Sequence, residues 1–124
     1  IGVEGDEALV KHAERNARKN NFANAFFEKA DLTQTELADY AWTSQGFNKI
    51  LLDPPRSGAF EVLHQFADLG AERLVYVSCN PATLARDAGE LVNKHGYQLV
   101  SAGVMDMFPH TNHVESIALF IKTT

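Results

Sequence analysis

The 124-residue sequence predicts an α/β fold with a mostly parallel sheet and an antiparallel hairpin at its C-terminal end. Short apolar segments alternate with amphipathic helical segments over short connections, which is the pattern of parallel strands joined by crossover helices. The last two apolar segments have no helical segment between them, so we expect them to pair as a hairpin at the edge of the sheet. Acidic or thiol side chains follow several predicted strands, and open α/β sheets bind ligands at that edge.

Six segments are predicted as strands because apolar residues dominate them and turn residues bound them. In chain order they are residues 1–4, 25–30, 47–52, 73–78, 97–107 and 114–122. A Pro-His-Thr-Asn-His turn joins the last two.

Four segments between the strands are predicted as helices, namely residues 6–20, 33–42, 59–69 and 82–95. In the first, Leu9, Ala13 and Ala17 recur along one face, which we expect to be the buried face. In the second, Thr33 and Glu36 have the spacing of a capping box.

The composition is that of a globular domain, with 45% hydrophobic and 22% charged residues. No apolar run approaches the ~18 residues needed to cross a membrane. A single cysteine excludes an internal disulfide, which favours a cytoplasmic protein. The net charge of −5 is unfavourable for phosphate binding, so most contacts to any nucleic acid should come from outside this chain.

That cysteine, Cys79, lies between a predicted strand and a predicted helix. Asn80 can cap the helix, and Pro81 suits its first position. A thiol just before a helix N-terminus feels the positive end of the helix dipole, which favours the thiolate. Cys79 is therefore a candidate nucleophile, and the alternative is a small buried hydrophobic residue.

Three acids stand at the ends of predicted strands. Glu4 can accept hydrogen bonds from both hydroxyls of a ribose, or place a negative charge at the start of the following helix. Asp31 can face an adenine amino group, or cap a helix. Asp53 begins the loop Asp53-Pro54-Pro55-Arg56, where two prolines hold the carboxylate in one direction unless the loop is an ordinary turn.

The segment 106–115 contains His110, His113 and Glu115, which are possible metal ligands. Their spacing matches no common zinc pattern, so no metal is expected. We interpret Glu115 as a base held near a bound substrate, with a solvated acid at a strand start as the alternative.

Three motifs together, residues 53–56, 78–87 and 106–115, resemble the RNA uracil-5-methyltransferases, and more narrowly the bacterial enzymes that modify 23S ribosomal RNA. The resemblance covers essentially all of residues 1–124. It implies a Rossmann-like class I S-adenosylmethionine-dependent methyltransferase fold, of which this chain is the C-terminal part within a longer protein. It also implies that the first strand, the glycine-rich loop and an N-terminal region with a cysteine-ligated 4Fe–4S cluster lie outside this chain.

The resemblance further implies methyl transfer from S-adenosylmethionine to C5 of a uridine in 23S ribosomal RNA, through a covalent adduct between a cysteine and C6. It assigns Cys79 as the nucleophile and Glu115 as the general base, with Glu4, Asp31 and Asp53 as cofactor contacts. The residues expected to contact RNA are Arg56, Arg86, Phe108 and His110.

Other functions remain open. One is uracil-5 methylation of transfer RNA. Another is RNA cytosine-5 methylation, although those enzymes usually carry a cysteine in the loop that is residues 53–56 here. A third is a non-catalytic module: with the first strand absent, we expect either direct pairing of the strands 1–4 and 47–52, or self-association that covers the exposed apolar surface.

Overall fold

The computed structural model describes residues 1–123, which fall into two compact units. The first unit comprises residues 1–39, and the second begins at Tyr40. Within residues 1–123, no helix is both long and apolar enough to cross a membrane.

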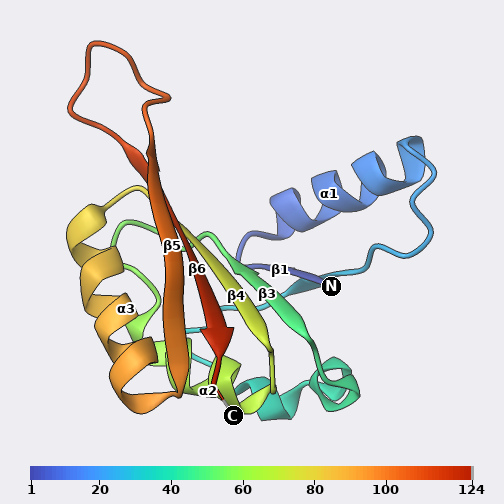
Figure 1. Ribbon diagram of the computed structural model, residues 1–124. Coiled ribbons are helices and arrows are strands. Elements are labelled where there is room, and N and C mark those ends of the chain that lie inside the picture. Colours follow the sequence, from blue (N-terminus) through green and yellow to red (C-terminus); the bar gives the residue numbers. More distant parts are fainter. Residues whose placement is uncertain (124) are drawn as a thin grey trace. The chain divides into compact units, whose positions relative to one another are not determined.

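In the first unit, a helix connects two short parallel strands. The strands β1 (Gly2–Glu4) and β2 (Phe27–Lys29) pair in parallel, and α1 (Glu7–Lys19) joins them (Figure 1). The predicted buried face of α1 is wrong at Leu9, which is 56% exposed. The prediction is confirmed at Ala17, which is buried. Val10 is buried in place of Leu9, and it lies seven residues before Ala17 on the same face.

The second unit contains a four-stranded mixed sheet in the order β3-β4-β6-β5. Its strands are β3 (Lys49–Leu52), β4 (Arg73–Ser78), β5 (Tyr97–Met105) and β6 (Glu115–Lys122). β3 and β4 are parallel, whereas β6 is antiparallel to both β4 and β5. The predicted C-terminal hairpin is confirmed, and β5 forms the edge of the sheet.

Two helices accompany this sheet. A single 3₁₀ turn (Phe60–Val62) leads into α2 (Leu63–Asp68), and α3 (Pro81–Lys94) follows β4. The predicted start of α3 is confirmed, because the Asn80 side chain accepts a hydrogen bond from the Ala82 amide and Pro81 takes the first helical position. The largest fully buried side chains of the unit are Leu63, Leu74, Tyr76, Asp87, Leu91 and Phe120.

The predicted helix over residues 33–42 is wrong. The chain forms turns and two 3₁₀ helices there, Leu37–Asp39 and Ala41–Gln45. Asp31 accepts hydrogen bonds from the amide and the hydroxyl of Thr33, and the Thr35 hydroxyl donates to the Asp31 carbonyl. These local side-chain bonds offer the backbone an alternative to the α-helix, so Thr33 does not form the expected capping box with Glu36.

Direct pairing of the strands 1–4 and 47–52 would join the two units, and it stays a prediction. Within the first unit β1 pairs with β2, and within the second β3 pairs with β4. The other expectation, self-association, stays a prediction.

Candidate active site

The candidate site of the second unit lies where β3 and β4 end. These parallel strands are in register, with Leu52 opposite Tyr76, so both carboxyl ends meet the same edge of the sheet. Asp53 follows β3 directly and is exposed, and Cys79 follows β4 directly and is half-buried. The candidate nucleophile and one candidate cofactor contact are thus at adjacent strand ends.

Glu115 begins β6, the antiparallel neighbour of β4 on its other side. The register pairs Ser78 with Ser116. In an antiparallel pair one strand advances as the other recedes, so the residue after Ser78 lies across from the residue before Ser116. This places Cys79 across from Glu115, and both are half-buried.

Short hydrogen bonds fix the backbone around Cys79. The Ser78 hydroxyl accepts from the Asn80 amide at 3.0 Å and donates to the Asn80 carbonyl at 2.9 Å. The Asn80 side chain then caps α3 through the Ala82 amide at 3.1 Å. Residues on both sides of Cys79 are therefore held, and the thiol stands just before the helix N-terminus, as predicted. That this position favours the thiolate stays a prediction.

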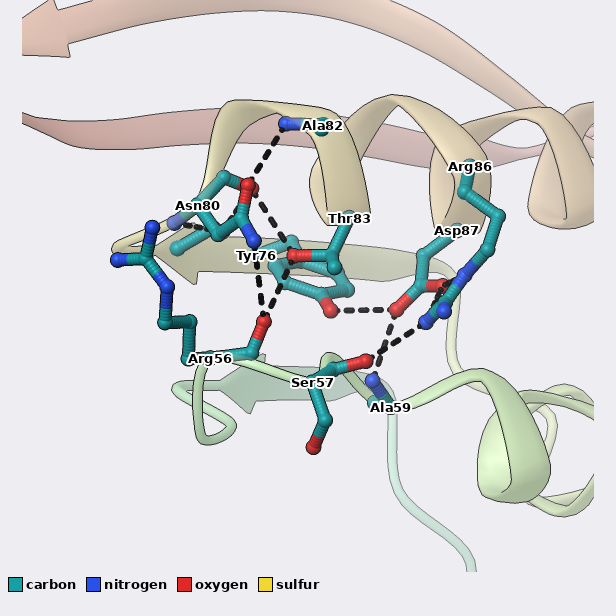
Figure 2. A network of polar contacts seen from close by, with 10 residues as sticks. Arg56, Ser57, Ala59, Tyr76, Asn80, Ala82, Thr83, Arg86 and Asp87 are labelled. Carbon is teal, nitrogen blue, oxygen red and sulfur yellow. Dashed lines mark hydrogen bonds and ion pairs between the residues drawn. The ribbon is translucent and has the colours of Figure 1, made fainter.

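Side chains of α3 and its cap hold the loop that follows Asp53 (Figure 2). The Arg56 carbonyl accepts hydrogen bonds from Thr83 Oγ1 at 3.2 Å and Asn80 Nδ2 at 3.4 Å. One residue further on, the Ser57 carbonyl accepts from Arg86 Nη2 at 2.8 Å. Side chains of α3 and its cap therefore bind the backbone carbonyls of the loop.

Asp87 is the buried centre of this network (Figure 2). Its Oδ2 accepts from the Tyr76 hydroxyl at 2.6 Å and the Ala59 amide at 2.8 Å, while Oδ1 accepts from Arg86 Nε at 2.8 Å and Nη2 at 2.7 Å. All four contacts come from donors, which suits an ionised carboxylate that accepts only. Burial raises the pKa of Tyr76 far above its ordinary value, and the hydrogen bond to Asp87 raises it further.

Sequence reasoning did not identify this network, although one signal was present. Asp87 falls between Leu84 and Leu91 at helical spacing, and these three are the buried residues of α3. A carboxylate on the apolar face of an amphipathic helix needs donors, which is the signal of a buried polar cluster. The donors themselves come from other segments, and the sequence does not show which.

Two further predicted residues belong to the first unit. Glu4 ends β1 and Asp31 follows β2, and the Ala30 amide donates to the Glu4 carbonyl at 3.0 Å, so both acids stand at the same edge of the two-stranded sheet. Glu4 Oε1 accepts from the Asp6 amide, a contact at the start of α1. Asp31 accepts two bonds from Thr33, which lower the pKa of the Asp31 carboxyl. The Glu4 contact matches the alternative role foreseen for it at the start of α1, whereas Asp31 holds a turn and caps no α-helix. The cofactor roles of both acids stay predictions.

The loop between β5 and β6 extends beyond the sheet (Figure 1). Phe108 is exposed at 44%, and His110 adopts a left-handed backbone conformation with φ 64°. The Thr111 hydroxyl and amide both donate to the Phe108 carbonyl, which closes a turn. Among residues 1–123, no three His, Cys, Asp or Glu side chains gather as a metal site would require.

Solved structures define the class of this fold. The crystal structure of Pyrococcus abyssi tRNA (uracil-54, C5)-methyltransferase with S-adenosyl-L-homocysteine matches with a TM-score of 0.78 and 34% identity, over 97% of this chain and 28% of that one. A magnesium protoporphyrin IX methyltransferase from Synechocystis PCC 6803 with bound SAM shares the fold alone, with a TM-score of 0.68 and 16% identity over 98% of this chain and 58% of that one. The fold is thus that of a class I S-adenosylmethionine-dependent methyltransferase, as predicted.

The chain belongs to the tRNA (uracil-5-)-methyltransferase family, whose model matches residues 14–123. It is 63% identical over 120 residues to the 23S rRNA (uracil(1939)-C(5))-methyltransferase RlmD of Alkalilimnicola ehrlichii, a match that covers 97% of this chain and 27% of the relative. The chain therefore spans about a quarter of that relative's length. The resemblance predicted from the three motifs is confirmed, including its narrower form.

Proposed function

We propose that the full-length protein containing this chain is a cytoplasmic enzyme that methylates C5 of a uridine in 23S ribosomal RNA. The observation that carries the proposal is the β4–β6 register, which sets Cys79 across from Glu115. A thiol and a carboxylate in this arrangement suit a reaction that needs a nucleophile and a base on one substrate ring. The name of the Alkalilimnicola relative supports the choice of 23S ribosomal RNA.

In the proposed mechanism, Cys79 and Glu115 act in turn. Uracil C5 is a poor nucleophile until a group adds to C6, and the Cys79 thiolate makes that bond, leaving an enolate with electron density at C5. C5 then bonds to the methyl carbon, whose bond to the donor sulfur breaks and leaves its electron pair on that sulfur. Glu115 accepts the C5 proton, the C5–C6 double bond forms again, and the C6–S bond breaks to return the Cys79 thiolate. The target base must leave its stack to reach these residues.

S-adenosylmethionine supplies the electrophilic methyl group in this proposal. We assign Glu4, Asp31 and Asp53 to hold it, because strand-end carboxylates can accept from ribose hydroxyls and an adenine amino group. A cysteine-ligated 4Fe–4S cluster does not fit this chain, which has one cysteine. Any such cluster belongs to the rest of the protein, and no step above involves it.

Contacts to the RNA are assigned to exposed side chains near the site. Arg56 is an exposed cation in the loop held by α3 and can contact a phosphate. Phe108 and His110 are exposed on the β5–β6 loop, where their rings are free to stack on a base. With a chain of net charge −5, most phosphate contacts should come from other parts of the protein.

The first test is to trap the covalent adduct. The full-length protein is mixed with S-adenosylmethionine and 23S RNA carrying 5-fluorouridine, and a denaturation-resistant protein–RNA species is sought. Fluorine cannot leave C5 as a proton does, so wild type should accumulate the adduct and Cys79→Ala should form none. Methylation of natural RNA without any adduct would show that Cys79 is not the nucleophile.

Glu115→Gln tests the second step on natural RNA. Without a base to remove the C5 proton, this variant should stall after methyl transfer and accumulate an adduct whose uracil already carries the methyl group. Mass spectrometry of the linked nucleotide identifies that species. Normal release of product by Glu115→Gln would contradict the assignment of the base.

Transfer RNA is the second candidate substrate, because the Pyrococcus abyssi relative is a tRNA enzyme at 34% identity. Methyl transfer to a tRNA transcript but not to 23S RNA would favour it. Nucleoside analysis of the product separates methyluridine from methylcytidine. The non-catalytic alternative concerns the 124-residue chain alone, and transfer by the full-length protein with none by this chain would support it.

A further inference from the structure

We infer that Tyr76, Thr83, Arg86 and Asp87 are positioning residues for the proposed methyl transfer, on which this inference rests. We call these four side chains the loop clamp. Together they fix the backbone of residues 56–59 against α3, the helix that starts two residues after the nucleophile Cys79. The clamp thereby sets the loop that begins at Asp53 in one position relative to the thiol.

The clamp acts on backbone atoms of the loop. The carbonyls of Arg56 and Ser57 accept from α3 side chains, and the Ala59 amide donates to Asp87. The loop's own contribution is a turn closed by the Gly58 amide and the Pro55 carbonyl at 2.9 Å. Because the contacts involve main-chain atoms, they fix the path of the loop whatever its side chains do.

Asp87 gives the clamp its rigidity. The carboxylate is fully buried, and Arg86 pairs with it while also reaching the Ser57 carbonyl. The Asp87–Arg86 ion pair is a weak source of stability, since the Arg86 side chain is 46% exposed and water screens its charge. The Asp87 carboxylate instead fixes directions, because it accepts from four donors in three segments: the Tyr76 hydroxyl of β4, the Ala59 amide of the loop, and Nε and Nη2 of Arg86 in α3.

At Gly58 the backbone of the loop lies very close to the side chains of Asp87 and Arg86. Its φ is +85°, and a Cβ there would lie 2.6 Å from Asp87 Oδ2 and 2.7 Å from Arg86 Nη2. Only glycine allows the loop backbone this near to the charged pair. Pro54 and Pro55 stiffen the stretch between Asp53 and the held carbonyls, so the clamp's effect extends to Asp53.

Loss of the clamp should therefore lower the rate of the chemical step. Small misplacements of reacting groups cost up to about 10²-fold in rate. The test compares two variants of the full-length protein that each lose one buried tyrosine hydroxyl. Tyr76→Phe removes the bond to Asp87, and Tyr97→Phe removes a 2.8 Å bond to the Ala71 carbonyl, in a part of the sheet remote from the loop.

The measured quantities are the thermal midpoint, the single-turnover rate of methyl transfer at saturating RNA and cofactor, and hydrogen exchange at the Ala59 amide. We expect similar midpoints for the two variants. Tyr76→Phe should lower the rate by about tenfold or more and speed exchange at Ala59, whereas Tyr97→Phe should change neither. Equal rates and equal exchange in the two variants would overturn the clamp.

Hydrogen exchange separates this inference from the proposed function. If wild type methylates no RNA, the proposed function fails, and faster exchange at Ala59 in Tyr76→Phe alone would still support the held loop. If wild type is active and Tyr76→Phe matches it in rate, the clamp fails as a positioning device. Asp87→Asn should have a larger effect on the rate and on exchange, because the NH₂ group of the new amide must face a hydrogen-bond donor. If Asp87→Asn does not fold, Tyr76→Phe still tests the clamp.

Discussion

At the scale of single residues, the close contacts of Gly58 make a prediction about stability. Gly58→Ala adds a methyl group where the backbone has φ +85° and where Asp87 and Arg86 leave no room. Gly70→Ala provides the matched control, because Gly70 has φ +77° and nothing lies within 4 Å of the position that its added methyl group would take. Both variants should lose about 1–2 kcal/mol to backbone strain.

Gly58→Ala should lose more, since its methyl group must also displace the buried Asp87 carboxylate and the Arg86 guanidinium that pairs with it. Chemical denaturation of the full-length protein, followed by the fluorescence of Trp42 in the second unit, measures the difference. An equal loss of unfolding free energy in the two variants would show that Asp87 and Arg86 move away from the added methyl group without destabilising the fold. The loop would then not be tightly held.

The same residues show how far sequence reasoning reaches at this scale. The roles of Asn80 and Pro81 can be predicted from residue type, because Asn is a preferred helix cap and Pro is a preferred first helical residue. Asp87 and Gly58 do not, since their importance depends on a contact between segments 29 residues apart in the chain, as for Arg86 and Ser57. That Cys79 lies across from Glu115 likewise follows from the β4–β6 register, continued one residue past Ser78 and Ser116, and the residues alone leave this register open.

At the scale of elements, the segment after β2 explains the largest error in the predicted secondary structure. The Thr33–Glu36 spacing favoured a helix, but Asp31 binds the amide and hydroxyl of Thr33 first. A helical pattern and a local turn compete for the same polar groups, and the outcome depends on small differences in free energy. β4, by contrast, is observed over the predicted residues 73–78, because a buried apolar strand has no such competitor.

This turn predicts a change in titration. The Thr33 hydroxyl and amide hold the pKa of Asp31 below its ordinary value of 3.8. Thr33→Val removes the hydroxyl and keeps the amide, so the pKa of Asp31 should rise towards 3.8 without passing it. Thr35→Val is the control, because the Thr35 hydroxyl donates to the Asp31 backbone carbonyl. Carbon-detected NMR titration of the Asp31 carboxyl measures both variants.

The sign of the linked stability follows from the lowered pKa. A carboxyl with a lowered folded-state pKa stabilises the fold above its unfolded-state pKa, and that contribution disappears as the pH falls through the folded-state value. Wild type should therefore lose more stability than Thr33→Val on acidification below about pH 4. An unchanged Asp31 titration in Thr33→Val would mean that the hydroxyl bond does not persist in solution.

At the scale of the whole molecule, the two faces of the four-stranded sheet differ. One face carries Leu52, Tyr76 and Ala118, which pair across the strands and are buried. The side chains between them along the strands point to the opposite face. There Leu51 is 69% exposed and Ile117 is 36% exposed. An α/β sheet with a parallel pair is normally covered on both faces, so this exposed apolar face needs a cover.

We expect the 124-residue chain, when produced alone, to self-associate through this face. Leu51→Lys should weaken the association because it places a charge where the apolar contact would form. Val92→Lys makes the same exchange at an exposed position on α3, 42% exposed, and should leave the association unchanged. Sedimentation velocity over a range of concentrations distinguishes the variants. A chain that stays monomeric at every concentration would show that this face tolerates water without a partner. If both lysine variants associate as the wild-type chain does, the association uses another face.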